Sequence, residues 1–289
     1  RLGPCSEARP GHVAMLLDNH PELLALFAGC AYARLTLFGV NTGLRGDMLA
    51  AVIEQSRARL LVVDERLLPE VERVRGRLHR LADENLLVLR TSGAAAPGPR
   101  DLEARLADEV AKPGESLAAP PLDARPEDNL MVIYTSGTTG LPKGINNNHF
   151  KLLAIGLNVA QRLALDPDDV GYACMPLFHS NSLFLGFQPA FHAGASLALR
   201  ERFSASAFVP DVLRHGVTWW NYVGEPVHYI LEAIRAGYGD DEPRIVADVA
   251  RDPRNRLRWA LGNGASPPDI DRFVRWLGLE DMFELYGST

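Results

Sequence analysis

Cysteine is scarce in this sequence, and its few copies form no recognisable framework. The 289 residues include only three cysteines, at Cys5, Cys30 and Cys174. Their odd number and wide spacing match neither a zinc-binding motif nor a set of disulfides. We therefore expect free thiols in a reducing compartment, which favours a cytoplasmic location.

A membrane-spanning segment and an excess of positive charge are also lacking. The longest apolar run, Leu23–Ala33, stops at Arg34, well short of the roughly 20 residues that a span requires. No secretory signal pattern begins the sequence, and peripheral contact with a membrane stays open. The 30 Lys and Arg against 36 Asp and Glu give a net charge of −6. We expect no nucleic-acid partner, and an anionic ligand has to be held by local groups.

What the sequence does contain is an alternation of helix-like and strand-like segments, with 47% hydrophobic residues to build a core. Amphipathic patterns predict helices over about 21–34 and 47–57, while Leu60–Val63 and Leu86–Leu89 are apolar runs typical of short buried strands. Strands that alternate with helices favour mostly parallel sheets flanked by helices. The predicted fold class is therefore α/β.

We expect the chain to be organised in two halves. The first, 1–125, forms one layer of strands and helices, with a helix over 67–81 and an irregular Gly/Ala/Pro-rich connection over 91–126. The second, 127–289, contains the candidate site. Its predicted elements are helices at 150–162, 204–214, 225–235 and 268–276, and strands at 170–175, 195–199, 217–220, 257–261 and 282–285.

The most informative segment is an apolar strand, Leu130–Tyr134, that ends in a Ser/Thr/Gly loop closed by Pro142-Lys143-Gly144. Glycines let the backbone N–H groups approach an anion closely, and a lysine can reach phosphate oxygens. The loop is not a Walker A sequence, which requires Ser or Thr directly after the lysine. The pattern predicts a nucleotide-phosphate cradle, against the alternative of a surface loop with one solvated lysine. Its members are Thr135, Ser136, Gly137, Thr138, Thr139, Gly140 and Lys143.

The stretch Tyr134–Gly144 resembles the phosphate-binding signature of the adenylate-forming superfamily, which includes acyl-CoA synthetases, luciferases and the adenylation domains of peptide synthetases. Met175–Gly186, with its Pro-Leu-Phe-His, and Leu261–Thr289 resemble further landmarks of that family, in the family's order. The residues of the last segment and of Tyr222–Glu225 resemble those found in the branch of fatty-acid transport proteins and very-long-chain acyl-CoA synthetases. The resemblance spans essentially the whole chain.

This resemblance implies a fatty-acid–CoA ligase for long or very long chains. Such an enzyme uses ATP and Mg²⁺ to convert a carboxylic acid to acyl-AMP with release of pyrophosphate, and then forms the thioester with CoA. The chain looks like part of the AMP-binding N-terminal domain. Family members continue after Thr289 with a Mg²⁺-binding glutamate and later a C-terminal lid domain with a catalytic lysine, so we expect the chain by itself to be inactive.

The resemblance also implies roles for individual residues. Lys143, His179 and Thr289 take the catalytic roles, and Thr135 adds a contact to Mg²⁺. The nucleotide lies against the phosphate loop and against a second group, in which Tyr286 stacks on adenine and Thr289 faces the α-phosphate. His179 lies at the acyl entrance, and Tyr222 and Gly224 line the acyl tunnel. The members of the second nucleotide group are Gly262, Asn263, Gly264, Tyr286, Gly287, Ser288 and Thr289.

One segment departs from the family pattern. Ile145–Asn148, before His149, replaces a usually apolar strand with three successive asparagines, which favour a turn. A second polar cluster, Asp166–Asp169, also predicts a turn in preference to a metal site.

A purely structural role remains an alternative for the other candidate site residues. Gly262-Asn263-Gly264 also suits a plain turn between a strand and a helix, and a lone histidine such as His179 is often structural. At the level of function, the alternatives are a nucleotide-binding module without catalysis, an acyl-AMP ligase that loads a carrier protein, and a ligase for steroid side-chain acids.

We predict that Lys143→Ala in the complete protein weakens ATP use at least about tenfold, because a cation that reaches phosphate oxygens is lost. The variant should keep its melting temperature, since the lysine is expected to face solvent. The measurement is pyrophosphate release from acid plus ATP. Release at the wild-type rate would contradict the role assigned to Lys143.

Overall fold

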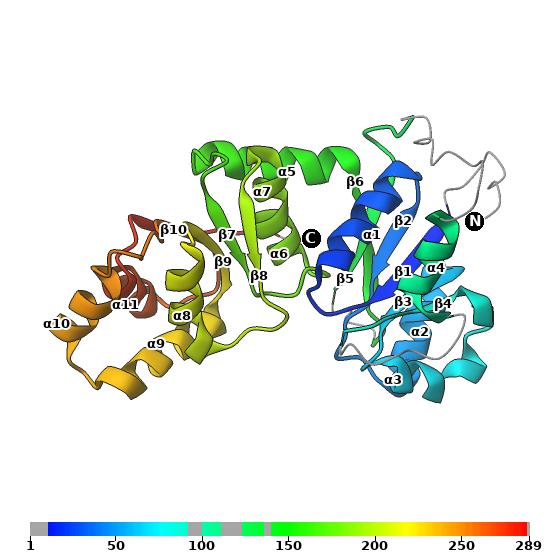
Figure 1. Ribbon diagram of the computed structural model, residues 1–289, viewed down its shortest axis with the longest axis horizontal. Helices are drawn as coiled ribbons and strands as arrows, with labels where there is room; N and C mark the ends of the chain where they lie inside the picture. Colours follow the sequence, from blue (N-terminus) through cyan, green and yellow to red (C-terminus); the bar gives the residue numbers. More distant parts are fainter. Residues whose placement is uncertain (1–10, 92–99, 111–122, 136–139, 288–289) are drawn as a thin grey trace. The chain divides into compact units, whose positions relative to one another are not determined.

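The computed structural model describes residues 11–91, 100–110, 123–135 and 140–287. The chain divides into two compact units, Arg1–Phe150 and Lys151–Thr289, and each is built on its own sheet (Figure 1). The predicted boundary near 126 differs from this division, because the strands on either side of the phosphate loop pair with the sheet of the first unit.

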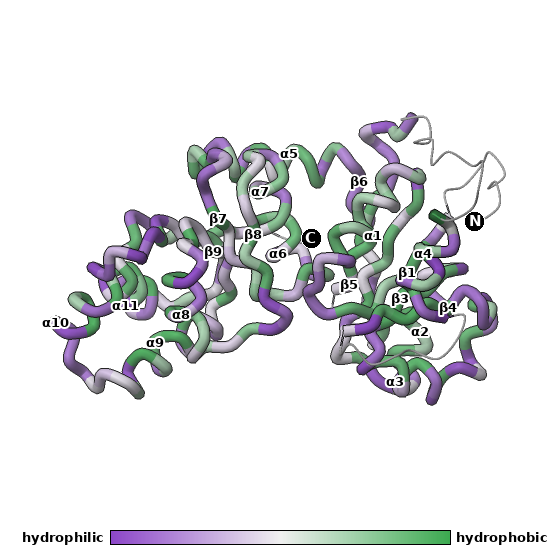
Figure 2. The backbone as a smooth tube through the Cα atoms, viewed as in Figure 1, coloured by the Kyte–Doolittle hydropathy of each residue, from purple (hydrophilic) through white to green (hydrophobic). Residues whose placement is uncertain are grey.

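The first unit contains a six-stranded sheet in the order β4-β3-β1-β2-β5-β6. The first five strands are parallel, and β6 is antiparallel to β5. Apolar runs such as those of β3 and β4, which are green in Figure 2, suit strands covered on both faces. The strands are β1 His12–Leu16, β2 Thr36–Gly39, β3 Leu60–Asp64, β4 Leu86–Leu89, β5 Asn129–Thr135 and β6 Lys143–Asn148.

Helices α1, α2 and α3 of the first unit bury apolar side chains, whereas Leu106 and Val110 of α4 are exposed. In α2, Leu49, Val52 and Ile53 belong to the same buried cluster as Leu61 and Val63 of β3. The helices are α1 Pro21–Tyr32, α2 Gly46–Ser56, α3 Leu68–Arg73 and α4 Leu102–Val110, with short 3-10 turns at Arg75–Arg77 and Asp83–Asn85.

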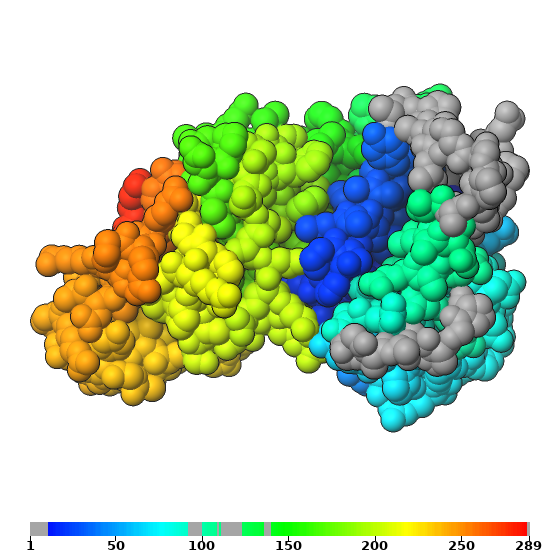
Figure 3. Space-filling view, in the orientation of Figure 1, coloured from blue at the N-terminus to red at the C-terminus, as the bar shows by residue number. Residues whose placement is uncertain are grey.

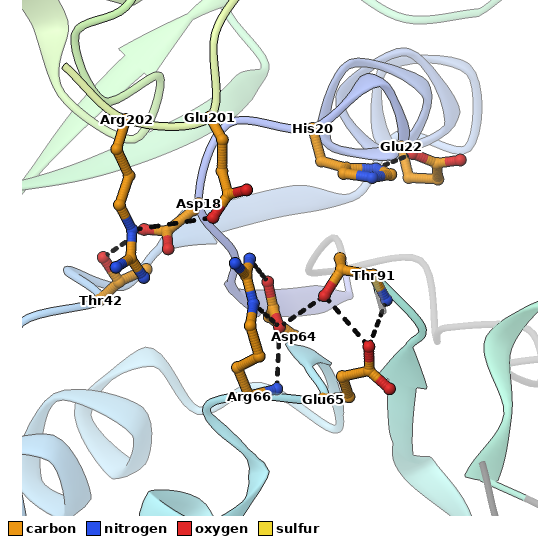
Figure 4. A network of polar contacts seen from close by, with 10 residues as sticks. All are labelled: Asp18, His20, Glu22, Thr42, Asp64, Glu65, Arg66, Thr91, Glu201 and Arg202. Atoms are coloured by element: carbon orange, nitrogen blue, oxygen red, sulfur yellow. Dashed lines mark hydrogen bonds and ion pairs between the residues drawn. The ribbon is translucent and has the colours of Figure 1, made fainter. Parts of the chain in front are cut away.

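A network of polar contacts joins the carboxyl ends of β3 and β4. Asp64 accepts hydrogen bonds from the backbone N–H of Arg66 at 2.9 Å and from Thr91 Oγ1 at 3.1 Å, while the Thr91 backbone N–H donates to Glu65 Oε1 at 2.7 Å (Figure 4). Burial would raise the pKa of Asp64, but the hydrogen bonds and charge of Arg66 outweigh burial and hold it below its usual value. The network fastens two neighbouring strand ends to each other.

The second unit contains a five-stranded, fully parallel sheet in the order β11-β10-β9-β7-β8. Its strands are β7 Val170–Ala173, β8 Ser196–Leu199, β9 Trp219–Val223, β10 Trp259–Asn263 and β11 Asp281–Glu284. The chain enters through α5 His149–Arg162. The other helical segments are α6 Ser180–Ser182, a π-helical turn Leu183–Phe187, α7 Gln188–Ala193, α8 Ala205–His215, α9 Gly224–Tyr238, α10 Glu242–Ile245, a second π-helical turn Val246–Ala250, and α11 Pro267–Leu277.

Aromatic side chains form the core of the second unit. The ring of Trp220 on β9 lies 4.6 Å from that of Phe208 in α8 and stacks on Phe273 of α11 at 5.5 Å. All three are fully buried. In the space-filling view, α8 and α9 (yellow-green to light orange) lie on the visible surface of the second unit (Figure 3). None of the described helices is long and apolar enough to cross a bilayer.

The α/β prediction is confirmed, with corrections in three places. The helix expected over 67–81 ends at Arg73, and a 3-10 turn that includes Gly76 follows it, because glycine is a poor helix former. The connection over 91–126 contains α4, whose first turn is capped by Asp101, which accepts from the backbone N–H of Ala104 at 3.1 Å. The turn expected at 145–148 is wrong.

Those asparagines lie in β6, an edge strand. Asn147 is fully buried, and its amide donates to the carbonyl of Ile145 at 3.0 Å and to that of Met131 at 3.4 Å. Asn146 is exposed. An edge strand has one sheet neighbour, so polar side chains can find solvent or backbone partners there, and tertiary pairing overrides the local preference for a turn.

Gly171 of β7 provides a test of the packing in this sheet. A Cβ there would lie 2.4 Å from Trp219 Cζ2. We therefore predict that Gly171→Ala lowers the free energy of unfolding by about 1–3 kcal/mol through overpacking. The matched control is Gly237→Ala, at an exposed helical position with open space around the new methyl group, which should stabilise by up to about 1 kcal/mol. Denaturant unfolding measures both, and equal effects would contradict the packing argument.

Candidate active site

The phosphate loop connects β5 and β6 in an antiparallel pair of the first unit. Thr135 pairs with Lys143 at the open end of the pair, and Thr135 Oγ1 donates to the Lys143 carbonyl at 3.5 Å. Gly140 has φ +96°, a backbone conformation that favours glycine. The cradle residues Ser136, Gly137, Thr138 and Thr139 lie outside the described residues. The pairing places both ends of the loop at the carboxyl end of β5, where ligands of α/β sheets commonly bind.

Lys143 has the environment that an anion-binding lysine needs. Its side chain is exposed, and no ion pair links it to another residue in the described part of the chain. The neighbouring Gly144 lies close to the sheet, since a Cβ there would be 2.8 Å from Val132 Cγ1. The backbone is therefore tightly packed while the lysine side chain extends freely.

In the second unit, the candidate residues follow the carboxyl ends of parallel strands, which share one edge of the sheet. Tyr222 of β9, Gly262 of β10 and Glu284 of β11 are register partners across the three strands. Partners in register project to the same face, so a tyrosine, a glycine and a glutamate form one row. Because Gly262 in the middle has no side chain, the side chains of Tyr222 and Glu284 can meet above it.

Tyr222 lies directly on Gly262. A Cβ at Gly262 would be 2.8 Å from Tyr222 Cγ and 2.1 Å from the Tyr222 carbonyl oxygen. The Tyr222 ring is fully buried, and its hydroxyl donates to Glu284 Oε1 at 2.6 Å. Burial, followed by the hydrogen bond to Glu284, raises the pKa of Tyr222. The space that Gly262 leaves open is thus filled by the tyrosine, and the role of Gly262 in adenine contact stays a prediction.

Glu284 was not among the residues selected from the sequence. Its carboxylate accepts hydrogen bonds from the backbone N–H groups of Gly264, at 3.0 Å, and Ala265, at 3.1 Å, in addition to that from Tyr222. A signal was present in the alternation of β11: Met282 is buried in the aromatic core, and Glu284 lies on the same face two residues later. Glu284 is exposed at the end of the strand, and its side of the sheet is the one that carries Tyr222.

The loop that follows β10 is held closely against the start of α9. A Cβ at Gly224 would lie 1.8 Å from the carbonyl oxygen of Gly264, so no other residue fits there without movement of the backbone. Gly264 itself has φ +85°. Gly224 therefore has a packing requirement of its own, whatever part it takes in an acyl tunnel.

Tyr286 follows β11 and has no cover among the described residues, with a relative exposure of 108%. A fully exposed aromatic ring after the carboxyl end of a strand is available to stack on a flat ligand. Gly287 is also exposed. Ser288 and Thr289, the other members of this motif, lie outside the described residues.

His179 follows β7 and precedes α6. Its ring is half-buried and lies 4.6 Å from the Phe178 ring. Burial lowers the pKa of His179, so the imidazole is neutral near pH 7. The next segment is tied to β9, because Asn181 Nδ2 donates to the Tyr222 carbonyl at 2.9 Å and Asn221 Nδ2 donates to Asn181 Oδ1 at 2.7 Å. The histidine therefore belongs to a fixed segment at the same edge of the sheet.

The two described cysteines and the aspartate cluster have no place in this site. Cys30 and Cys174 are buried free thiols, and burial raises the pKa of each to about 12, which makes them unreactive near neutral pH. Asp166–Asp169 forms a turn in which the Asp166 backbone N–H donates to Asp169 Oδ2 at 2.9 Å. Within the described ranges, no group of three His, Cys, Asp or Glu side chains could hold a metal ion. Thr135 offers one hydroxyl oxygen, which fits a Mg²⁺ ion held mainly by nucleotide phosphates.

Comparison with known proteins decides the family. A family model described as AMP-binding enzyme matches residues 6–289. The chain belongs to this family. The resemblance drawn from the sequence is therefore confirmed, and so is the expected fold.

Three curated relatives illustrate the range of similar proteins. A medium/long-chain-fatty-acid–CoA ligase of Mycobacterium tuberculosis is 34% identical over 100% of this chain and 50% of its own length. Steroid-22-oyl-CoA synthetase of Rhodococcus jostii is 32% identical over 97% of this chain and 45% of its own length. Human long-chain fatty acid transport protein 1 is 30% identical over 97% of this chain and 41% of its own length. The chain thus spans about half the length, or less, of these relatives.

Solved structures share the fold. An anthranilate CoA ligase in complex with anthranoyl-AMP matches 96% of this chain and 50% of its own, with a TM-score of 0.76 and 20% identity. A long-chain-fatty-acid–CoA ligase from Archaeoglobus fulgidus matches 95% of this chain and 50% of its own, with a TM-score of 0.73 and 19% identity.

We predict that His179→Ala in the complete protein changes KM or kcat for the acid at least about fivefold more than KM for ATP, because the histidine is assigned to the acyl entrance. The control is His228→Ala, an exposed histidine on α9, which should change neither. An equal effect on both substrates, together with a lower melting temperature, would instead indicate a structural histidine.

Proposed function

We propose that the complete protein is an acid–CoA ligase that activates a long-chain fatty acid with ATP. The carboxylate attacks the α-phosphorus of ATP, pyrophosphate leaves, and the thiol of CoA then displaces AMP from acyl-AMP to form the thioester. The observation that carries the proposal is the family match over nearly the whole chain, together with fatty-acid–CoA ligases among its relatives.

The chemistry requires positive charge and N–H donors, because two anions have to approach each other. In this proposal Lys143 and the loop that begins at Thr135 hold the phosphates of ATP, and Mg²⁺ is bound through those phosphates with Thr135 as one contact. The exposed, unpaired state of Lys143 in the described structure supports this role. Thr289 faces the α-phosphate.

The base of the nucleotide is assigned to the second unit. Tyr286 stacks on adenine, beside the strand end that carries Gly262, Asn263 and Gly264, with Gly287 and Ser288 in the following turn. Tyr286 follows β11, whose neighbour in the sheet is β10, and this position supports the assignment. His179 marks the acyl entrance, where a neutral imidazole can lie beside the carboxyl group without competing for the phosphates.

The names of the relatives indicate the class of acid. Relatives named for medium- and long-chain fatty acids and for long-chain fatty acid transport favour a long-chain acid, and very long chains extend the same class. A steroid side-chain acid is a second candidate, because a steroid-22-oyl-CoA synthetase is similar at nearly the same identity. We place the protein in the cytoplasm, with peripheral contact to membranes as a route for such apolar acids.

A panel of substrates tests the proposal. The complete protein is incubated with ATP, Mg²⁺ and a long-chain fatty acid, a very-long-chain fatty acid or a steroid side-chain acid, and with CoA or an acyl carrier protein. We expect pyrophosphate release with the long-chain acid and a CoA thioester as the product, detected by mass spectrometry. Transfer only to the carrier protein would select the acyl-AMP ligase, while nucleotide binding without pyrophosphate release would select the non-catalytic module.

A further inference from the structure

We propose that Glu284 is a positioning residue for the nucleotide: from β11 its carboxylate fixes the Gly264–Ala265 backbone beside the predicted adenine site. This inference rests on the proposed function for its nucleotide part. The fixing of the backbone stands on the geometry alone.

Glu284 accepts hydrogen bonds from three donors in two separate segments of the chain, β9 and the loop after β10. Oε1 accepts from the Tyr222 hydroxyl of β9 at 2.6 Å and from the backbone N–H of Ala265 at 3.1 Å, and Oε2 accepts from the backbone N–H of Gly264 at 3.0 Å. Consecutive N–H groups that point to one side form a concave anion site, and the positive φ of Gly264 allows that arrangement here. In this protein the side-chain carboxylate of Glu284 occupies that site.

The strand register explains how these groups meet. Tyr222 and Glu284 lie on strands separated by β10, roughly 9.5 Å apart at the usual strand spacing, so their side chains have to extend toward each other across the middle strand. Gly262, the register partner of both, has no side chain to block them. The row of Tyr222, Gly262 and Glu284 therefore forms a bridge over the sheet that ends on the loop.

The loop is fixed from its other side as well. The carbonyl of Gly264 packs against Gly224 so closely that a Cβ there would lie 1.8 Å from the oxygen. The N–H of Gly264 is bound by Glu284 and its C=O is packed by Gly224, so the conformation of this residue is specified at both groups. The side chain of Asn263 remains exposed next to it.

Helix capping does not account for these contacts. The cap of α11 is Ser266, which accepts from the Asp269 backbone N–H at 3.3 Å. Gly264 and Ala265 precede that cap, so their N–H groups are not the unpaired donors of the helix start. Burial would raise the pKa of Glu284, but the hydrogen bonds from Tyr222, Gly264 and Ala265 outweigh it and hold the pKa below its usual value. The group is therefore a carboxylate at neutral pH, as acceptance from three donors requires.

Hydrogen exchange and kinetics on the complete protein test the proposal. In Glu284→Ala, without nucleotide, exchange at the Gly264 and Ala265 amides should rise at least about tenfold, because both lose their acceptor. KM for ATP should rise about tenfold, while KM for the acid changes less than about threefold. Glu284→Gln, which keeps the size of the side chain and one oxygen acceptor, should give an intermediate effect and provides the second variant if the alanine variant unfolds.

Two further variants isolate the carboxylate. Tyr222→Phe removes only the hydroxyl donor, so the two amides should stay more protected than in Glu284→Ala. Glu280→Gln, at an exposed glutamate just before the same strand, should match the wild type in every measurement. Unchanged amide exchange in a folded Glu284 variant would overturn the proposal. So would an equal rise in KM for ATP and for the acid together with a lower melting temperature.

Failure of the proposed function gives a different result. If the wild-type protein neither binds ATP nor releases pyrophosphate, the nucleotide role of Glu284 is overturned together with the proposed ligase. The exchange measurement contains no nucleotide, so it still reports whether the carboxylate fixes the loop. The two failures are therefore distinguishable.

Discussion

Close approach of strand ends to neighbouring segments is the constraint on which the candidate site of the second unit depends. A parallel sheet brings the carboxyl ends of its strands to one edge, but the groups there can interact only if nothing fills the space between them. Gly262 provides that space for Tyr222, and Gly224 provides it for the carbonyl of Gly264. The glycines are therefore required for the position of polar groups that lie on other strands.

The same arrangement, a glycine covered by the aromatic ring of its neighbour, occurs in the middle of this sheet, where no candidate site residue is involved. Gly171 of β7 is the register partner of Trp219 on β9, and the indole ring covers it. Glycine weakens a strand unless an aromatic neighbour covers the exposed backbone. The sheet thus contains two pairs of a glycine and an aromatic residue, of which one serves packing only and the other also carries a hydroxyl to Glu284.

The parts of the structure that could be predicted from the sequence are those that local pattern determines. Apolar runs such as Leu60–Val63 predicted strands correctly, and the hydroxyl- and glycine-rich loop after Tyr134 was recognised as distinctive, because both signals lie within one short segment. The asparagines of β6 were misjudged, since their strand depends on pairing with β5, and Asn147 donates to the carbonyl of Met131 from that partner. Glu284 was missed for a similar reason. Its two backbone donors lie 19 and 20 residues away, so they become visible only when the register is known.

Gly262, at the end of β10, leaves no open space for a ligand, because Tyr222 lies against it. From the sequence, the small residues after 261 indicated room for a flat base. In the structure, the space at Gly262 is filled by Tyr222, while Asn263 and the ring of Tyr286 are exposed. A base that binds at this edge therefore has to meet the exposed side chains and the backbone of Gly264, whose conformation is fixed from both sides. Rigid backbone at a binding surface lowers the entropy cost of ordering it around a ligand, and the carboxylate of Glu284 supplies that rigidity from a strand that the base need not contact.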